Sequence, residues 1–202
     1  MQLVGMLDSP YVRRVAISLR LLGLPFEHRS VSVFSTFEQF RAINPVVKAP
    51  TLVCDDGTLL MDSTLIIDYA EMMAGRSLMP SASVERQHAL RVLGLALAAC
   101  EKTVQIVYER KLRPLEKQHA PWVDRVRNQL AAAYAGLEAE IRKLPSAASE
   151  TTIGQAALTS AVAWSFTQLM IPDVIAPADC PSLAAFAADA EKLPAFVALP
   201  QV

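Results

Sequence analysis

The chain has 202 residues, of which 52% are hydrophobic, and a formal net charge of −1. Such a composition supports a buried core and excludes a disordered chain, and without a basic excess we expect neither nucleic acid nor membrane as a partner. The three cysteines have no C-x-x-C spacing and no histidine cluster beside them, so the sequence predicts no disulfide framework and no metal. The first residues lack the pattern of a signal peptide, and we expect a cytoplasmic protein.

The first predicted elements are a strand over residues 2–7, a helix that begins after Ser9, and a second strand over 26–33. Apolar residues recur at helical spacing through the helix, and Gly23 is suited to its end. The second strand rests on a loose alternation of apolar and polar residues. A polar stretch follows, in which we expect a loop or a short helix.

Residues 51–54 and 58–61 predict a β-hairpin, with Gly57 supplying the positive φ of its turn. A helix over 64–74 follows. Its inner side is expected to carry Leu65, Ile66, Tyr69 and Met73. Strands and helices that alternate and finish in a hairpin favour a small mixed sheet with helices packed on it, so residues 1–76 form the first predicted domain.

The strand pattern stops after residue 76. We expect a linker over 77–84 and an all-helical domain over 85–202, with helical periodicity over residues 84–111, 122–144, 153–170 and 182–192. The stretch from Ile153 to Pro172 has no charged residue, and its length would suit a membrane span. Polar residues interrupt it, so we interpret it as a buried central helix.

Ser9 and Pro10 stand where the first helix begins, and two interpretations apply. Serine is a good N-cap and proline suits the first helical turn. The same helix end presents free N–H groups and a partial positive charge, which stabilise a thiolate, and a serine hydroxyl can donate a hydrogen bond to that sulfur. Arg13 and Arg14 add positive charge nearby. The serine-proline pair alone favours the cap.

Two further pairs have the same ambiguity. Pro50 either opens a strand or forms a cis bond with Ala49 that turns the Ala49 backbone toward a peptide-like ligand. Asp62 and Ser63 either cap the next helix or hold a carboxylate at its N-terminus while Asp62 accepts from an ammonium group. A γ-glutamyl end carries both charges, so the last pair suits glutathione better than phosphate.

Together, in this order, these motifs resemble the glutathione S-transferase superfamily, above all its small bacterial serine-type members, and the resemblance covers the whole chain. The matching pieces are Ser9-Pro10-Tyr11-Val12-Arg13-Arg14, Gly23-x-Pro25, Asn44-Pro45, Lys48-Ala49-Pro50-Thr51-Leu52, and Asp62-Ser63 before Ile66-x-x-Tyr69. Thr152-Ile153-Gly154-Gln155 falls where the family has a capping box, with glutamine in place of its aspartate.

The resemblance implies a thioredoxin-like domain, an all-α second domain, a homodimer and glutathione as co-substrate. By position, Ser9 would meet the thiol as the catalytic residue, Ala49 the cysteinyl backbone, and Lys48 the glycyl carboxylate. Asp62 and Ser63 would meet the γ-glutamyl end. Family members more often have glutamate at position 62, so the shorter aspartate changes the strength of that contact.

The resemblance also implies a second-substrate pocket for a small, apolar electrophile, lined by the loop after the first strand and by the 84–111 helix. Its candidates are Leu7, Tyr11, Phe34, Tyr108 and Arg110. The alternative is that Phe34 and Tyr108 are core or dimer residues and that Arg110 is a solvated charge.

The predicted activity is conjugation of glutathione to electrophiles, as in detoxification. A non-catalytic glutathione-binding or regulatory protein of the same fold is the alternative. The lack of cysteine near position 9 argues against disulfide exchange, and Asp8-Ser9-Pro10 departs from the Ser-Ser-Cys of the maleylacetoacetate isomerase branch.

Overall fold

The computed structural model describes residues 1–143 and 149–201, and the chain divides into two compact units. The first comprises Met1–Leu78 together with Leu193–Val202, and the second comprises Met79–Lys192. The first unit is a small mixed sheet with helices and the described part of the second is helical. The expected fold class, a thioredoxin-like α/β domain followed by an all-α domain, is therefore confirmed.

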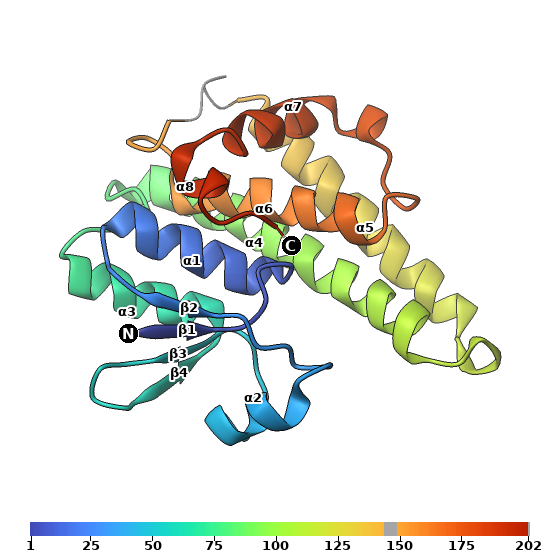
Figure 1. Ribbon diagram of the computed structural model, residues 1–202. Helices are drawn as coiled ribbons and strands as arrows, with labels where there is room; N and C mark the ends of the chain where they lie inside the picture. The colour runs from blue at the N-terminus through green and yellow to red at the C-terminus, as the bar shows by residue number, and fades with distance from the viewer. Residues whose placement is uncertain (144–148, 202) are drawn as a thin grey trace. The chain divides into compact units, whose positions relative to one another are not determined.

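The sheet of the first unit has four strands of three residues each (Figure 1). These are β1 (Gln2–Val4), β2 (Glu27–Arg29), β3 (Thr51–Val53) and β4 (Leu59–Met61), in the order β2-β1-β3-β4. β1 runs parallel to β2 and antiparallel to β3, and β4 completes the predicted hairpin with β3. The first two strands are shorter than expected, because the chain leaves the sheet at Gly5, whose φ is +141°.

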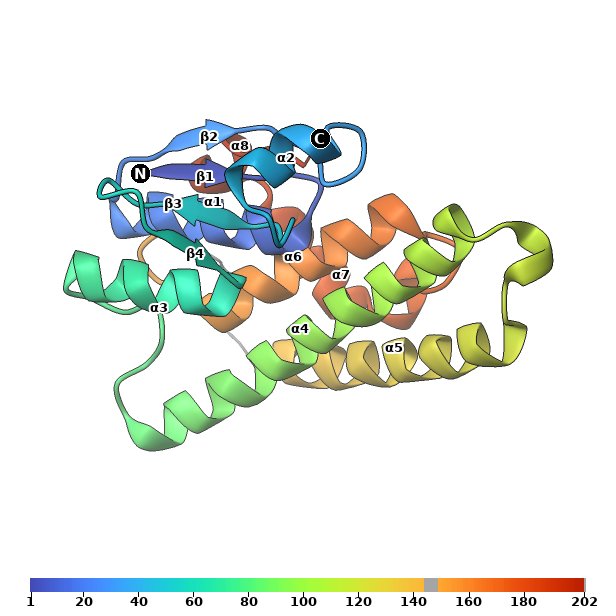
Figure 2. The same cartoon turned by 90° about the horizontal axis from the view of Figure 1, so that it is seen from below.

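Three helices cover this sheet: α1 (Pro10–Leu22), α2 (Phe37–Ile43) and α3 (Ser63–Ala74). α1 and α3 pack together on one face and α2 covers the other (Figures 1 and 2). Side chains of a strand alternate between faces, so Val4 packs with Phe40 of α2 while the buried Leu3 faces α1. The first unit therefore holds apolar residues on both sides of a narrow sheet.

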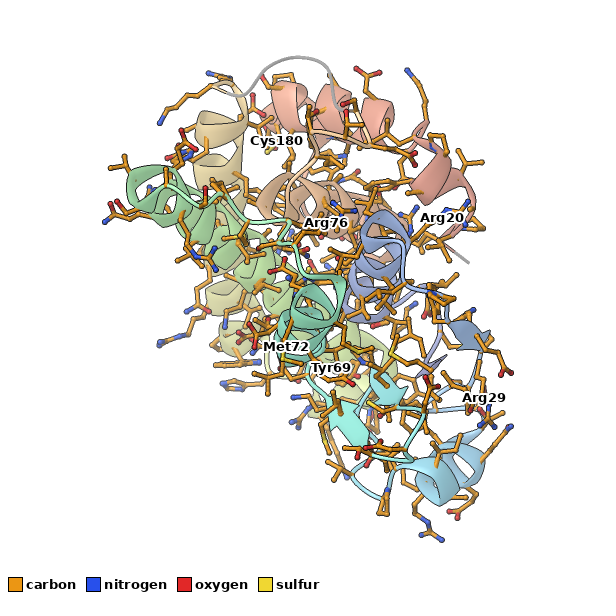
Figure 3. All side chains as sticks on the ribbon, turned by 90° about the vertical axis from the view of Figure 1, so that its left-hand side faces the viewer. Arg20, Arg29, Tyr69, Met72, Arg76 and Cys180 are labelled. Carbon is orange, nitrogen blue, oxygen red and sulfur yellow. The ribbon has the colours of Figure 1, made fainter. Side chains whose placement is uncertain are left out.

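The inner side of α3 is only partly as expected. Ile66 is fully buried, but Leu65 and Met73 are 64% and 47% exposed, so their predicted inward position was wrong. The buried stripe consists of Ile66, Ile67 and Ala70, which share one helical face. Met72 also extends from α3 into solvent (Figure 3).

The C-terminal residues differ from the expected domain boundary. Leu193–Val202, with the short helix α8 (Pro194–Val197), belong to the first unit and not to the helical domain assigned to 85–202. Arg13 of α1 holds this segment: its Nε donates to the Leu199 carbonyl at 2.9 Å, and its guanidinium lies 5.5 Å from the centre of the Phe196 ring. These partners are far apart in sequence, so periodicity did not reveal them.

The described residues of the second unit form four long helices, as the periodicity predicted: α4 (Ser83–Leu112), α5 (Ala120–Ile141), α6 (Gln155–Met170) and α7 (Pro181–Ala190). Single 3₁₀ turns, η1 (Leu115–Lys117) and η2 (Pro177–Asp179), lie in the connections. α4 packs on α5 and α6, and α7 packs on α6 (Figure 2). The expected end of the α5 helix at residue 144 lies outside the described residues.

α6 is the buried central helix that its lack of charge predicted. Leu158, Ala161 and Val162 have no exposed surface, and no helix in the described part of the chain is apolar over enough length to cross a membrane. Its predicted capping box is wrong. The N-cap is Gly154, so Gln155 is the first helical residue instead of the third, and its side chain donates to Thr159 Oγ1 at 3.3 Å.

Candidate functional site

Ser9 is the N-cap of α1, as expected, but its side chain does not cap the helix. Its backbone is extended (φ −68°, ψ 124°), and its hydroxyl makes no hydrogen bond to the N–H groups of the first turn. That turn contains no acidic residue, and Ser9 is half-buried. The first turn of α1 therefore has no acidic residue to offset the positive end of the helix dipole, and the Ser9 hydroxyl is not committed to the cap.

Gly5, the residue that follows β1 and precedes Ser9 by four positions, approaches Ala49 closely. A side chain on Gly5 would place its Cβ 2.5 Å from Val12 Cγ2 and 3.3 Å from Ala49 Cβ, so only glycine allows this approach. The Ala49-Pro50 bond is cis, as one of the two interpretations predicted. The backbone that leads from β1 toward Ser9 therefore passes close to Ala49, the residue expected to meet the cysteinyl backbone.

A buried asparagine network fixes the loop that carries Lys48 and Ala49. Asn44 Nδ2 donates to Thr51 Oγ1 at 2.8 Å, and Thr51 Oγ1 donates to the Lys48 carbonyl at 2.7 Å. Asn44 Oδ1 also accepts from the Val46 N–H at 3.0 Å. Sequence reasoning did not assign this role, although the Asn44-Pro45 pair that it singled out was the available signal.

Asp62 caps α3 and also contacts Lys48. Its Oδ1 accepts from the Thr64 N–H at 2.9 Å, which confirms the cap, while its Oδ2 lies 3.6 Å from Lys48 Nζ. The two residues expected at opposite ends of glutathione therefore pair with each other. Both side chains are about half exposed, and such a pair contributes at most about 1 kcal/mol. A ligand that brings its own charges can replace it.

Ser63, the first residue of α3, is buried, and its hydroxyl is held by α1. Arg14 Nη1 donates to Ser63 Oγ at 2.9 Å and lies 3.3 Å from Thr64 Oγ1. Arg14 itself is only 1% exposed. The charge predicted near Ser9 is thus directed to the start of α3 by Arg14, whereas Arg13 binds the C-terminal segment.

Three candidates for the second-substrate pocket belong to the first unit. Leu7 is buried, Tyr11 is half-buried at the start of α1, and Phe34 is 54% exposed in the turn after β2. The alternative that Phe34 is a core residue is therefore wrong.

The other two candidates belong to α4 of the second unit. Tyr108 is 42% exposed, so it is not a core residue either. Arg110 forms a two-point ion pair with Asp173, with N–O distances of 2.9 and 3.0 Å. The hydrogen bonds from Arg110 lower the pKa of the Asp173 carboxyl. The alternative of a simply solvated arginine is wrong, because Arg110 has a fixed partner.

The three cysteines lie in buried surroundings. Cys54, Cys100 and Cys180 are buried and form no disulfide bond. Burial raises the pKa of the Cys54 thiol, even though a hydrogen bond with Tyr69 opposes that rise. Across residues 1–143 and 149–201, no group of three or more histidine, cysteine or acidic side chains is arranged to hold a metal ion.

Comparisons with known proteins indicate which family the chain resembles. Residues 3–77 match the family described as "Glutathione S-transferase, N-terminal domain". The uncharacterized GST-like protein YibF of Escherichia coli (strain K12) is 28% identical over 139 residues, which are 68% of each chain. Glutathione transferase GST 23 of Zea mays is 31% identical over 90 residues, but these cover only 40% of the maize protein.

Among solved structures, the chain is similar to a glutathione transferase family member from Pseudomonas fluorescens Pf-5 with bound glutathione. The identity is 29%, the TM-score is 0.85, and the match covers 100% of this chain and 98% of that one. A second structure of a family member from the same strain, with bound S-(propanoic acid)-glutathione, gives 28% and 0.83. Residues 3–77 therefore match the glutathione S-transferase family, and over its whole length the chain has the fold of solved members of that superfamily.

Proposed function

We propose that the protein is a glutathione transferase that activates the glutathione thiol at Ser9 and conjugates it to a small, apolar electrophile. The observation that carries this proposal is the start of α1, where the Ser9 hydroxyl does not cap its own helix. The chain segment that leads to Ser9 also approaches Ala49 closely, at Gly5. The glutathione held by the similar Pseudomonas fluorescens protein supports the same ligand here.

In this proposal Ser9 donates a hydrogen bond to the thiolate, and the positive end of α1 stabilises its charge. A free thiol has a pKa of about 8.5, so a lowered pKa increases the nucleophile at neutral pH. The N–H of Ala49 has no hydrogen-bond partner in the described part of the chain, so it is available to the cysteinyl backbone. No metal is required for this chemistry.

The charged ends of glutathione would exchange with the Lys48–Asp62 pair. Lys48 would bind the glycyl carboxylate, Asp62 the γ-glutamyl ammonium, and Ser63 the γ-glutamyl carboxylate at the start of α3. Each new contact joins opposite charges or joins a hydroxyl donor to a carboxylate. The Lys48–Asp62 ion pair would therefore be replaced without leaving either charge unpaired.

The electrophile would contact apolar and aromatic side chains drawn from Leu7, Tyr11, Phe34 and Tyr108, with Arg110 as a polar member. Pockets of this kind encode shape more than chemistry, and detoxification is the role we propose for such a reaction. We also propose a homodimer. Leu65, Met72 and Met73 on α3 support it, because they expose apolar surface that a second copy would cover.

Calorimetric titration with glutathione, followed by conjugation assays with electrophiles of several sizes, tests the proposal. We expect saturable binding at one site per chain and thioether formation with at least one electrophile. Binding without conjugation of any of them would favour the non-catalytic alternative. S-methylglutathione is a suitable control, because it should bind as a competitor but cannot be conjugated. An absence of glutathione binding would refute both functions.

A further inference from the structure

We propose that Arg14 is a positioning residue that makes the start of α3 selective for a carboxylate, by orienting the hydroxyl of Ser63. This inference rests on the proposed function, because the carboxylate is that of the γ-glutamyl group. Arg14 contacts no predicted ligand atom itself. It acts from α1, through Ser63, on the end of glutathione farthest from the thiol.

The first step of the argument concerns the lone pairs of Ser63 Oγ. A serine hydroxyl has one proton to donate and two lone pairs with which to accept. Arg14 Nη1 donates to this oxygen at 2.9 Å, and guanidinium is a donor only. In the described residues Ser63 Oγ donates to no protein group. Its proton is therefore left for a ligand that accepts, such as a carboxylate oxygen.

The second step concerns charge. Arg14 is 1% exposed and Ser63 is 4% exposed, so solvent screens the guanidinium charge poorly at this point. The charge lies at the N-terminus of a 12-residue helix, whose dipole has the same sign there. Asp62 balances part of it, but the Asp62 carboxylate is turned to the Thr64 N–H and to Lys48. An anion next to Ser63 is thus favoured by both sources of positive potential.

The third step concerns rigidity. Arg14 also lies 3.3 Å from Thr64 Oγ1, so a single nitrogen contacts the first two residues of α3. The Ser18 hydroxyl donates to the Arg14 carbonyl at 2.6 Å, one turn further along α1. The spacing between the start of α3 and the helix that carries Ser9 is therefore held by the same arginine. The γ-glutamyl end and the thiol of glutathione would then both be positioned by residues of α1.

The test compares two ligands in four proteins. The ligands are glutathione and γ-aminobutyryl-cysteinylglycine, which is the α-decarboxylated analogue: it lacks only the α-carboxylate of the γ-glutamyl group and retains the amine. The proteins are the unsubstituted chain, Arg14→Met, Arg14→Lys and the control Arg20→Met, which replaces an exposed arginine on the same helix (Figure 3). Dissociation constants are measured by calorimetry.

We expect the unsubstituted chain and Arg20→Met to prefer glutathione over the decarboxylated analogue by tenfold or more. Arg14→Met should reduce this preference to about twofold by weakening glutathione alone, and Arg14→Lys should restore part of it. An equal loss of affinity for both ligands would overturn the proposal, because a merely structural arginine affects both alike. If the unsubstituted chain binds neither ligand, the proposed function fails instead.

Arg14→Met removes a buried charge and risks misfolding, so Ser63→Ala provides a second route. It removes the hydroxyl through which Arg14 is proposed to act and leaves the arginine in place. We expect it to lower the preference for the carboxylate by a similar factor, and Arg14→Gln added to it should lower the preference no further. Independent, multiplying effects of the two substitutions would overturn the proposal even if Arg14→Met cannot be purified.

Discussion

The starts of α1 and α7 have similar sequences, but their backbone N–H groups have different partners. Each helix has proline at its first turn and no side-chain cap of its own. At α7, the Glu138 carboxylate reaches across from α5 and accepts from the Ser182 and Leu183 N–H groups at 3.1 and 2.8 Å. At α1, no carboxylate from the first turn takes this place, and the Ser9 hydroxyl is not used as a cap.

Cys180 shows how the pKa of a thiol changes at a helix start whose N–H groups are already bound by a carboxylate. It is the N-cap residue of α7 (Figure 3), a position that ordinarily lowers the pKa of a thiol. Burial, and after it the negative charges of Glu138 and Asp179, instead raise the pKa of the Cys180 thiol to about 11. A helix dipole lowers the pKa of a thiol less where carboxylates already occupy the helix start, and the first turn of α1 contains no acidic residue.

The largest effect is expected at the start of α1, for the substitution of Ser9. Ser9→Ala should leave the free energy of unfolding nearly unchanged, since the hydroxyl makes no capping bond. It should lower kcat/KM for conjugation by about 100-fold, as the loss of one donor to a developing anion does. The pKa of bound glutathione should rise, measured by thiolate absorbance against pH. Equal thiolate absorbance in both proteins would rule out the role of Ser9.

At α7 the corresponding change should affect stability and not activity. Glu138→Gln keeps one accepting oxygen for two N–H donors, so we expect a loss of about 2 kcal/mol in unfolding free energy, with glutathione affinity unchanged. Chemical denaturation and calorimetric titration measure the two quantities. A variant with reduced affinity and normal stability would reverse the comparison.

The stability difference should also depend on pH. Burial alone would raise the pKa of the Glu138 carboxyl, but hydrogen bonds from Leu183 and Ser182 hold it below its ordinary value of 4.5. A lowered folded pKa stabilises the protein above the unfolded value, and this contribution is lost as pH falls through the folded value. The difference between the unsubstituted chain and Glu138→Gln should therefore be constant near neutrality and shrink below about pH 4.5.

The smallest effect is expected at the start of α3, where substitutions of Asp62 distinguish its role as a helix cap from its proposed role in glutathione binding. Asn caps helices as well as aspartate does and tolerates the positive φ of 73°. Asp62→Asn should thus keep stability but weaken glutathione binding about three- to tenfold, since the ammonium loses a charged partner. Asp62→Ala should show the same loss of affinity and a further loss of about 1 kcal/mol in stability from the missing cap. Full affinity in Asp62→Asn would show that Asp62 is only a cap.

Much of the fold was readable from local signals. The helix from Pro10 to Leu22 has proline at its start and a left-handed glycine, Gly23, at its end. The hairpin around Gly57 and the four long helices of the second unit follow from turn chemistry and apolar spacing alone. The inner face of α3 was predicted only in part, because several apolar residues could occupy it and only tertiary packing decides which ones are buried.

The sequence predicted which positions belong to the candidate site, but it did not predict the contacts between their side chains. The sequence by itself determined that Ser9 and Asp62 begin helices and that Pro50 follows Ala49, since caps and prolines act on neighbouring residues. Only the tertiary structure decided that Arg14 holds Ser63, that Lys48 pairs with Asp62, and that Arg13 binds the C-terminal segment. These contacts join residues 14 to 186 positions apart, and their geometry depends on how helices and loops pack, which no local pattern encodes.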